Sequence, residues 1–314
     1  MKTIEVRRSD VQRAGPLVVS PAGRRRLRDT LEGYAFLLPA LLGLALFWLG
    51  PVVASILISF TNWGSGQRVS WLGLENYRGL FTSPLFWKVF RNTWYYTLVS
   101  VPAGLLLSLC LALLANQKLR GIGIFRAVYF FPSIISMTAV ALMWSFLFNP
   151  DLGFIDYAIR RVFHVPGPDW VNSISWAMPA LIFVGVWKWA GYNMVIFLAG
   201  LQGIDRSLQE AAAIDGANSW QRFQHVTWPG LTPTTLFVLI IMLIGSFQVF
   251  EQTYVMTEGG PAYATLTMSY YIYLDAFQYF HMGQAAALAY VLFAVVCVVT
   301  ALQFAASRRW VFYQ

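Results

Sequence analysis

Two groups of polar side chains lie inside long apolar runs of this sequence. Lys188 falls near the middle of one run, and Tyr192 follows four residues later, on the same face of a helix. Gln248, Glu251 and Gln252 recur at i, i+3 and i+4 in a later run. Hydrogen-bonding side chains of this kind, beside aromatic rings, are what a polyhydroxylated solute needs.

Placing the Lys188 side chain in the middle of an apolar span costs free energy, and this cost limits the surroundings it can have. An ionised side chain in the middle of an apolar span costs about 2.5 to 3.5 kcal/mol on insertion scales, so we expect Lys188 to face a cavity or a carboxylate and not lipid. Two structural explanations remain open. Lys188 and Glu251 pair with each other, or Glu251 lies close enough to the outer surface to be solvated.

A third polar segment, EAAAIDGANSWQRFQHVTWP, starts at Glu210 and separates two apolar runs. Ser207 and Glu210 have the spacing of a capping box, and Gly216 stands where a helix C-terminus favours a residue that tolerates positive φ. Asn218 and Gln221 are suited to capping a second helix. The segment therefore predicts a water-exposed helical hairpin, which is either a coupling element or a plain connector.

The sequence contains none of the motifs that would make the chain an enzyme. It lacks a G-x-x-x-x-G-K-[ST] phosphate loop, a G-x-S-x-G elbow and an H-E-x-x-H helix. Its three histidines are far apart, and Cys110 and Cys297 each lie in an apolar run, so we expect no metal site and no disulfide framework. We therefore expect no cofactor in this chain. If a nucleotide powers its function, that nucleotide is hydrolysed on another chain.

The amino-acid composition indicates that membrane-spanning helices position these polar side chains. Of 314 residues, 58% are hydrophobic and 11% are charged, whereas soluble domains carry about 25% charged residues. The apolar runs are continuous, which favours membrane-spanning helices over the alternating strands of a barrel. We predict an all-α polytopic membrane protein with six transmembrane helices. The predicted spans are Ala35 to Phe60, Thr93 to Ala115, Val128 to Phe148, Ile174 to Leu201, Thr234 to Met256 and Gln284 to Ala306. Prolines within them are expected to kink the helices without breaking them.

The basic residues predict the orientation in a cell membrane. With the N-terminus inside, the inner segments hold fifteen Lys and Arg residues and the outer segments hold six. Both termini and the hairpin are therefore predicted to be cytoplasmic. This asymmetry accounts for the net charge of +8, so nucleic-acid binding is not expected.

The chain divides into two predicted parts. Residues 1–32 form a basic cytoplasmic tail, which lacks the features of a secretory signal peptide, and residues 33–314 form one transmembrane domain with its coupling loop at about 205–230. Residues 71–87, in the first outer loop, carry aromatic and leucine side chains among polar ones. They predict a helix at headgroup depth, or alternatively a partner-docking surface.

Several motifs together resemble a known family. Glu210-Ala211-Ala212, Asp215-Gly216-Ala217 and Pro229 look like the cytoplasmic EAA loop of permease subunits from binding-protein-dependent ABC importers, with glycine six residues after glutamate and proline thirteen after glycine. FLAGLQGID, SFQVFEQTYVMTEGGP, WLGLENYRGLF and FWKVFRNT narrow the likeness to the first permease subunit of the maltose and glycerol-3-phosphate type of carbohydrate importer. The likeness runs from about Tyr34 to the C-terminus.

The resemblance implies the partners and the mechanism. A six-helix subunit of this family pairs with a second, homologous permease in a bacterial or archaeal cell (inner) membrane. Two ATPase subunits, which hold ATP and Mg, lie below, and an extracytoplasmic solute-binding protein docks above. The hairpin inserts into a groove on the ATPase, and its motion opens the permease outward.

Roles for single residues follow from the same resemblance. Glu210 would hold polar contacts inside the hairpin and Gly216 would allow its turn. Ala211, Ala212 and Ala217 would permit close approach, and Ile214, Trp220 and Phe223 would supply apolar contact. Asp215 and Pro229, which belong to the motif, complete the predicted set of coupling residues. The family's sugar contacts lie on the helices either side of the loop, in the spans that hold Tyr192, Ser246 and Gln248 here. Together with Lys188 and Glu251, the charged residues of the apolar runs, they make up the predicted substrate pathway. Asp205 and Gln209 replace the proline and the aromatic residue frequent in the family, and we expect them to alter the hairpin's capping.

The sequence thus predicts a permease subunit of an ATP-driven sugar importer, which forms half of the translocation pathway. It does not name the sugar. A permease for glycerol-phosphate diesters or other small polar solutes is the alternative, because Lys188 would suit an anionic substrate. A self-sufficient secondary transporter would need inverted repeats with interrupted spans, and the sequence shows no such pair. A membrane enzyme or scaffold would leave the hairpin without a purpose.

Overall fold

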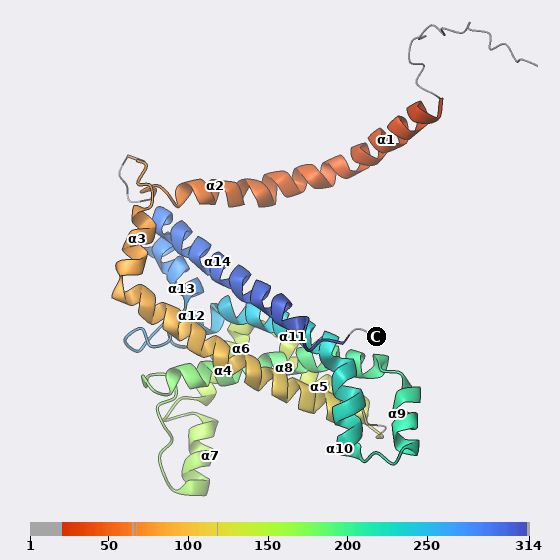
Figure 1. The fold of residues 1–314 in the computed structure, drawn as a ribbon. Helices are drawn as coiled ribbons and strands as arrows, with labels where there is room; N and C mark the ends of the chain where they lie inside the picture. The colour runs from red at the N-terminus through yellow and green to blue at the C-terminus, as the bar shows by residue number, and fades with distance from the viewer. Residues whose placement is uncertain (1–20, 65, 67, 118, 313–314) are drawn as a thin grey trace, which may run out of the picture. The chain divides into compact units, whose positions relative to one another are not determined.

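The computed structural model describes residues 21–64, 66, 68–117 and 119–312. The chain divides into two compact units, Met1–Ser55 and Ile56–Gln314 (Figure 1). The first twenty residues of the predicted basic tail lie outside the described residues, as does Lys118, one of the basic residues assigned to the inner side.

The first unit is a single helical run. It consists of α1 (Pro21–Leu44), the π-helical turn η1 (Ala45–Leu49) and α2 (Gly50–Ile58), whose last turn belongs to the second unit. The helix begins at Pro21, so the last part of the predicted tail is helical. Its 27 residues Glu32–Ile58 are apolar and long enough to cross a membrane.

The second unit is built from helices, and its described residues include one isolated antiparallel bridge, between Thr61 and Trp71, and no strand. Its elements are α3 (Glu75–Thr82), α4 (Pro84–Ala115), α5 (Ile122–Ile134), α6 (Met137–Leu147), α7 (Phe154–Phe163), α8 (Ala177–Gly203), α9 (Arg206–Ile214), α10 (Ser219–Arg222), η2 (Phe223–Thr227), α11 (Trp228–Phe247), α12 (Glu251–Met256), α13 (Met268–Tyr273), η3 (Leu274–Gln278) and α14 (Met282–Ser307).

The described residues contain five helices suited to crossing a membrane, or six when the bent pair α5 and α6 counts as one span. The prediction of an all-α membrane fold is confirmed. α4 starts well before the predicted Thr93, because Ser83 caps it and Pro84 suits its first turn. At 32 residues it is about 48 Å long, more than the roughly 30 Å of a hydrocarbon core.

The third span is broken, which corrects the prediction of one continuous helix from Val128 to Phe148. α5 and α6 bend by 99° at the break. Pro132 lies in the last turn of α5, and Ile135 after it has an extended backbone with ψ of 143°. The expectation that prolines would only kink the spans therefore holds at Pro102, inside α4, and is wrong at Pro132.

The fifth span is broken too, which corrects the predicted helix from Thr234 to Met256. α11 ends at Phe247 and α12 begins at Glu251. Carbonyl groups freed at this break accept hydrogen bonds from side chains just before and in α13. Thr267 Oγ1 donates to Val249 O (2.8 Å) and Ser269 Oγ to Phe247 O (3.4 Å). The sequence showed no interrupted spans, and the structure has two.

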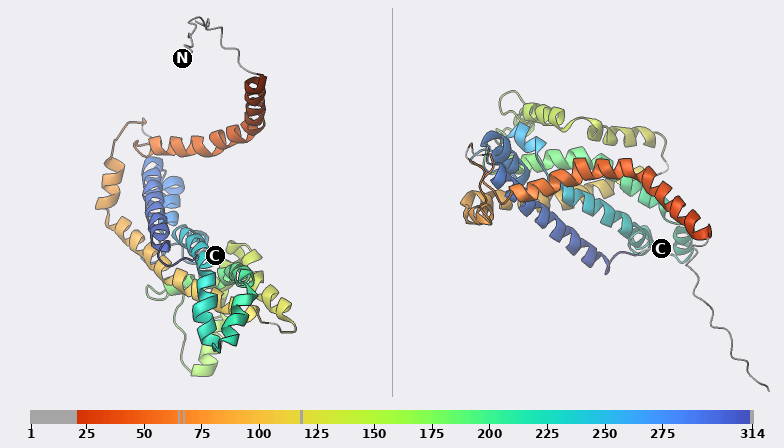
Figure 2. Two further views of the ribbon diagram at one scale, coloured as in Figure 1. Left: turned by 45° about the vertical axis from the view of Figure 1, so that its right-hand side comes forward. Right: turned by 90° about the horizontal axis from the view of Figure 1, so that it is seen from above.

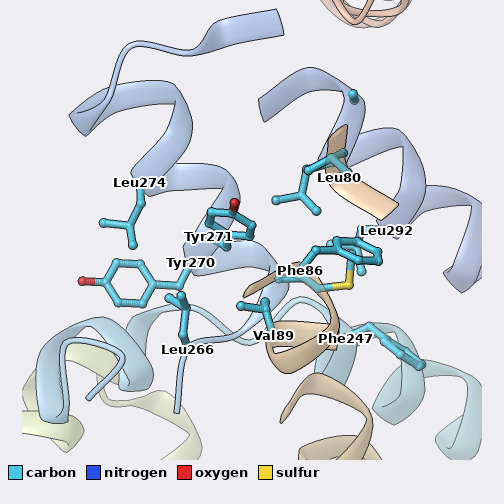
Figure 3. Close-up of a cluster of buried hydrophobic side chains, with 12 residues drawn as sticks. Leu80, Phe86, Val89, Phe247, Leu266, Tyr270, Tyr271, Leu274 and Leu292 are labelled. Atoms are coloured by element: carbon cyan, nitrogen blue, oxygen red, sulfur yellow. The ribbon is translucent and has the colours of Figure 1, made fainter. Parts of the chain in front are cut away.

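α8 lies at the centre of the second unit and packs against α4, α5 and α11. Gly191 permits the closest approach, because a Cβ atom there would collide with the carbonyl of Tyr129 in α5. One hydrophobic cluster surrounds Met194 and Phe197 of α8, and a second surrounds Trp144 of α6. Figure 3 shows the third cluster, in which Phe86 and Val89 of α4 pack with residues of α13 and α14.

The two ends of the second unit differ. α9 and α10 form a hairpin at the end where the described chain finishes, and α3 and α13 lie at the opposite end (Figures 1 and 2). The backbone N–H of Phe312 donates to Thr232 Oγ1 (3.0 Å) near the start of α11, which attaches the C-terminal residues beside the hairpin. The hairpin and the C-terminal residues, which were predicted to lie on one side of the membrane, therefore lie at one end of the bundle.

Candidate functional site

A cavity of about 410 Å³ opens among the central helices, at the breaks of the third and fifth spans. α4, α8 and α11 provide most of its wall, the start of α6 adds Met137, and the chain between α11 and α12 closes it. The lining residues are Tyr96, Ser100, Val101, Gly104, Met137, Gly185, Val186, Trp189, Tyr192, Asn193, Ile241, Met242, Gly245, Ser246, Gln248, Val249, Phe250, Glu251 and Gln252.

The lining combines aromatic rings with neutral hydrogen-bonding groups. Trp189 and Tyr192 make an edge-to-face pair, with ring centroids 6.0 Å apart. Gln252 is 3% exposed and spans the wall, since its Nε2 donates to Tyr96 Oη (2.7 Å) and to Leu181 O (3.3 Å). This network fixes the Gln252 amide and presents the tyrosine hydroxyl at the wall, so the cavity offers apolar faces and fixed polar groups together.

The structure brings four of the five predicted pathway residues together. Tyr192, Ser246, Gln248 and Glu251 all line the cavity, from three different segments of the chain. Lys188 does not line it. The predicted polar stripe differs in one respect, because the helix break leaves Gln248 at the end of α11 and places Glu251 in the first turn of α12. The three polar residues of the stripe therefore converge through an irregular segment and not through one helical face.

Lys188 is 2% exposed and contacts the break in the third span. Its Nζ donates to Ile135 O (2.6 Å) and to Pro132 O (3.2 Å), and lies 5.1 Å from the centroid of the Trp189 ring. These carbonyls belong to the last turn of α5 and the residue after it, where no following helical turn supplies donors. Lys188 thus hydrogen-bonds backbone carbonyls behind the cavity wall, an environment the sequence analysis did not consider.

Several lining residues were missed. Tyr96, Trp189, Asn193 and Phe250 gave no signal, because an aromatic or amide residue in an apolar run is as common in a packed interface as in a cavity. Gln252 did give a signal through its spacing from Gln248, but it was not placed in the pathway.

The predicted hairpin forms, with caps that differ in part from the prediction. Asn218 and Gln221 make the expected capping box, with reciprocal hydrogen bonds of 2.8 and 2.9 Å. α9, however, is capped by Asp205, whose Oδ1 accepts from the Ser207 N–H (2.9 Å). That N–H donation lowers the pKa of the Asp205 carboxyl. Asp205, which stands where the family often has proline, therefore supplies the cap that the sequence assigned to Ser207.

The turn and the internal contacts of the hairpin are also clear. Gly216 has φ of +82°, the left-handed conformation expected of it. Gln209 Nε2 donates to Thr227 Oγ1 (3.1 Å), which ties α9 to η2. Glu210 is exposed, and its side chain makes no hydrogen bond or ion pair with the described residues. Gln209 therefore makes the internal polar contact that the family resemblance implied for Glu210.

The hairpin exposes apolar side chains at its tip and along α10. Ile214 is 86% exposed and Trp220 68%, and the Trp220 ring stacks on Phe223 with centroids 5.6 Å apart. The ten predicted coupling residues all lie in α9, the turn, α10, η2 and the first turn of α11: Glu210, Ala211, Ala212, Ile214, Asp215, Gly216, Ala217, Trp220, Phe223 and Pro229. An exposed apolar patch on a rigid, capped hairpin is suited to binding another protein. Within the described residues, no group of three His, Cys, Asp or Glu side chains is placed to hold a metal ion.

Known proteins share this sequence and this fold. The lactose transport system permease protein LacF of Rhizobium radiobacter is 38% identical over 284 residues, which cover 89% of this chain and 95% of LacF. The structure of a bacterial ABC transporter involved in the import of the acidic polysaccharide alginate matches with a TM-score of 0.81 and 25% identity, covering 92% of this chain and 99% of that one. A structure of the alginate transporter in complex with its alginate pentasaccharide-bound periplasmic protein matches with a TM-score of 0.80 and 25% identity, covering 91% and 96%.

The family assignment rests on the region that holds both the cavity and the hairpin. Residues 100–311 match the family described as binding-protein-dependent transport system inner membrane component. The chain that holds the two broken spans and the capped hairpin also aligns with these permeases over most of its length. The chain is therefore a member of the binding-protein-dependent transport system inner membrane component family, an ABC transporter permease.

Proposed function

We propose that this chain is a permease subunit of an ATP-driven sugar importer and forms half of its translocation pathway. The observation that carries the proposal is the cavity, whose aromatic rings and fixed neutral hydrogen-bonding groups suit a sugar's apolar faces and hydroxyls. The similarity to a lactose permease supports a carbohydrate substrate. The remaining half of the pathway comes from a second, homologous permease subunit.

The energy source lies on other chains. Because the sequence has no phosphate-binding loop, ATP and Mg are held by two ATPase subunits, and this chain is not an enzyme. The exposed Ile214 and Trp220 of the hairpin insert into a groove on one of these subunits. An extracytoplasmic solute-binding protein delivers the sugar at the opposite end of the bundle, a role supported by the periplasmic protein bound to the alginate transporter.

The chain lies in the bacterial or archaeal cell (inner) membrane with both termini cytoplasmic. Two observations support this orientation. Basic residues are concentrated in the segments assigned to the inside, and the hairpin shares one end of the bundle with the C-terminal residues.

Reconstitution tests the proposed function. The complete complex, with both permeases, the ATPases and the binding protein, is placed in proteoliposomes, and uptake of radiolabelled mono- and oligosaccharides is measured with and without ATP. We expect ATP-dependent accumulation of at least one sugar. If no carbohydrate of any size accumulates although the complex hydrolyses ATP, the proposed function is wrong.

A matched pair of tryptophans tests the coupling surface. Trp220 is 68% exposed on the hairpin, and Trp71 is 65% exposed at the opposite end of the bundle. Truncating an aromatic anchor of an interface costs about 2 kcal/mol or more, roughly a thirtyfold loss of affinity. We expect Trp220→Ala to lose the ATPase during purification and Trp71→Ala to retain it. Equal retention by both variants would contradict the assignment of the hairpin.

A further inference from the structure

We propose that Glu251 makes this half of the pathway selective for uncharged polyhydroxylated solutes and against anionic ones. The inference rests on the proposed function and names the substrate class of the same cavity. Chains of this fold serve transporters of both substrate classes, because LacF is named for lactose, which is uncharged, and the alginate transporter for an acidic polysaccharide.

A single residue gives the wall of the cavity its charge. Among the residues that line the cavity, Glu251 is the one with an ionisable acid or base of full charge, and every other polar lining group is a hydroxyl, an amide or an indole. Glu251 lies in the first turn of α12 with its side chain exposed. Its carboxylate accepts hydrogen bonds from solute hydroxyls, whereas it repels a carboxylate or phosphate in the same space.

Lys188 is the cation that would otherwise suit an anion. It is 2% exposed, and its ammonium group donates to two backbone carbonyls at the break of the third span. A solute anion would have to displace these hydrogen bonds to reach it, leaving the carbonyls of Pro132 and Ile135 unpaired.

The rest of the cavity wall is neutral. Tyr96 and Gln252 are held by their mutual hydrogen bond, and Trp189, Tyr192 and Phe250 supply ring faces. Such groups bind hydroxyls and the apolar faces of pyranose rings without needing a charge on the solute. None of them can neutralise an anion.

The test uses three uncharged sugars and their acids. Lactose, maltotriose and cellobiose are compared with their aldonates, which carry one carboxylate at the oxidised end. Binding to the detergent-solubilised permease–ATPase complex is measured by saturation-transfer NMR without the binding protein, so that its selectivity does not contribute. The variant is Glu251→Gln, and Glu258→Gln is the matched control, because Glu258 is also exposed and loses the same charge but does not line the cavity.

We expect wild-type complex to bind at least one sugar about tenfold more tightly than its aldonate, the size of effect that one like charge has at partly solvated range. Glu251→Gln should bring this ratio to within about twofold, and Glu258→Gln should leave it unchanged. An aldonate that binds wild type as tightly as its parent sugar, a ratio unaltered in Glu251→Gln, or no binding of any of the six compounds would overturn the inference. The proposed function fails separately, when the reconstituted complex accumulates no carbohydrate.

Discussion

The Lys188 ammonium group donates hydrogen bonds to backbone carbonyls at the end of a helix. A helix that stops inside a protein leaves carbonyl groups without partners, and a cation near the helix C-terminus also interacts favourably with the helix dipole. Lys188 supplies both effects at the end of α5, through Pro132 and Ile135. The sequence placed Lys188 in the predicted transport pathway, whereas in the structure its side chain binds the end of α5.

Replacing this lysine should destabilise the fold. Lys188→Met keeps most of the side-chain volume but leaves two carbonyls unpaired, that of Pro132 buried and that of Ile135 half-buried, at about 1 to 3 kcal/mol each. We expect the free energy of unfolding to fall by about 2 to 5 kcal/mol, measured by denaturation in detergent. Lys88→Met is the matched control, because Lys88 also donates to a backbone carbonyl, that of Ala262 (2.6 Å), but this hydrogen bond is exposed to solvent. A loss of similar size in both variants would contradict the role given to Lys188.

Asp275, outside the spans, is the residue whose burial gives a pH dependence. It is 3% exposed in η3, and Oδ2 has no hydrogen-bond partner among the described residues. Burial raises its pKa from 3.8 to about 6, against a smaller opposing effect of His281. Between these values the unfolded chain releases a proton that the folded protein retains, so stability falls as the pH rises from about 4 to about 6 and is constant above.

The difference between a pKa of 3.8 in the unfolded chain and one of about 6 in the folded protein corresponds to about 3 kcal/mol, the upper bound for this loss of stability. Asp275→Asn should remove the decline, so the variant gains stability over wild type at pH 7 and not at pH 4. Thermal unfolding in detergent across this range measures it, with Asp169→Asn, a substitution of an exposed carboxyl, retaining the wild-type profile. A wild-type-like decline in Asp275→Asn would show that another group is responsible.

At the level of elements, the hairpin depends on one left-handed residue. Gly216 has φ of +82° and open space around the position of a Cβ atom, so an alanine there meets conformational strain and no collision. We expect Gly216→Ala to cost about 1 to 2 kcal/mol and to reduce ATPase retention on purification by about tenfold.

Gly203 provides the control for this prediction. It also has open space around it, but it lies in the last turn of α8 without a positive φ. Gly203→Ala should therefore leave retention unchanged and stabilise the helix slightly. If Gly216→Ala retains the ATPase as well as Gly203→Ala does, the shape of the turn does not matter for coupling.

The hairpin was predictable because its signals are local. The capping box of Asn218 and Gln221 and the turn at Gly216 need only residues within one or two helical turns. The breaks in the third and fifth spans were not, since their stability comes from partners far along the chain. Lys188 satisfies carbonyls more than fifty positions earlier, and Thr267 satisfies Val249 from the far side of α12. Hydropathy registers such a span as continuous, because its apolar composition does not change at the break.

For the whole molecule, the arrangement of ends predicts which side each surface faces. In a variant with Cys110 and Cys297 replaced by serine, single cysteines at Ile214 and Trp71 report on opposite ends of the bundle. A membrane-impermeant thiol reagent should label Trp71→Cys in intact cells and Ile214→Cys only in inverted membrane vesicles. The cysteine-free protein gives the background. Labelling of both positions from one side would contradict the orientation.

The cavity is a property of the whole molecule, which explains how much of it could be foreseen. Polar residues in apolar runs pointed to Tyr192, Gln248 and Glu251, because charge and hydrogen bonding are expensive in lipid wherever the residue lies. Tyr96 and Phe250 could not be recognised, because only the packing of α4 and α8 with the α11–α12 break places them on a common surface.

The interrupted fifth span has a consequence for how such permeases change over evolutionary time. Residues 248–250 lie outside helices yet line the cavity, and the carbonyls of Phe247 and Val249 are satisfied by Ser269 and Thr267. A substitution at Gln248 or Phe250 therefore alters the surface that meets the solute without incurring the helix-propensity penalty that the same change would carry inside α11. Mutations can diversify what a lineage imports while the helices that cross the bilayer keep their hydrogen bonds.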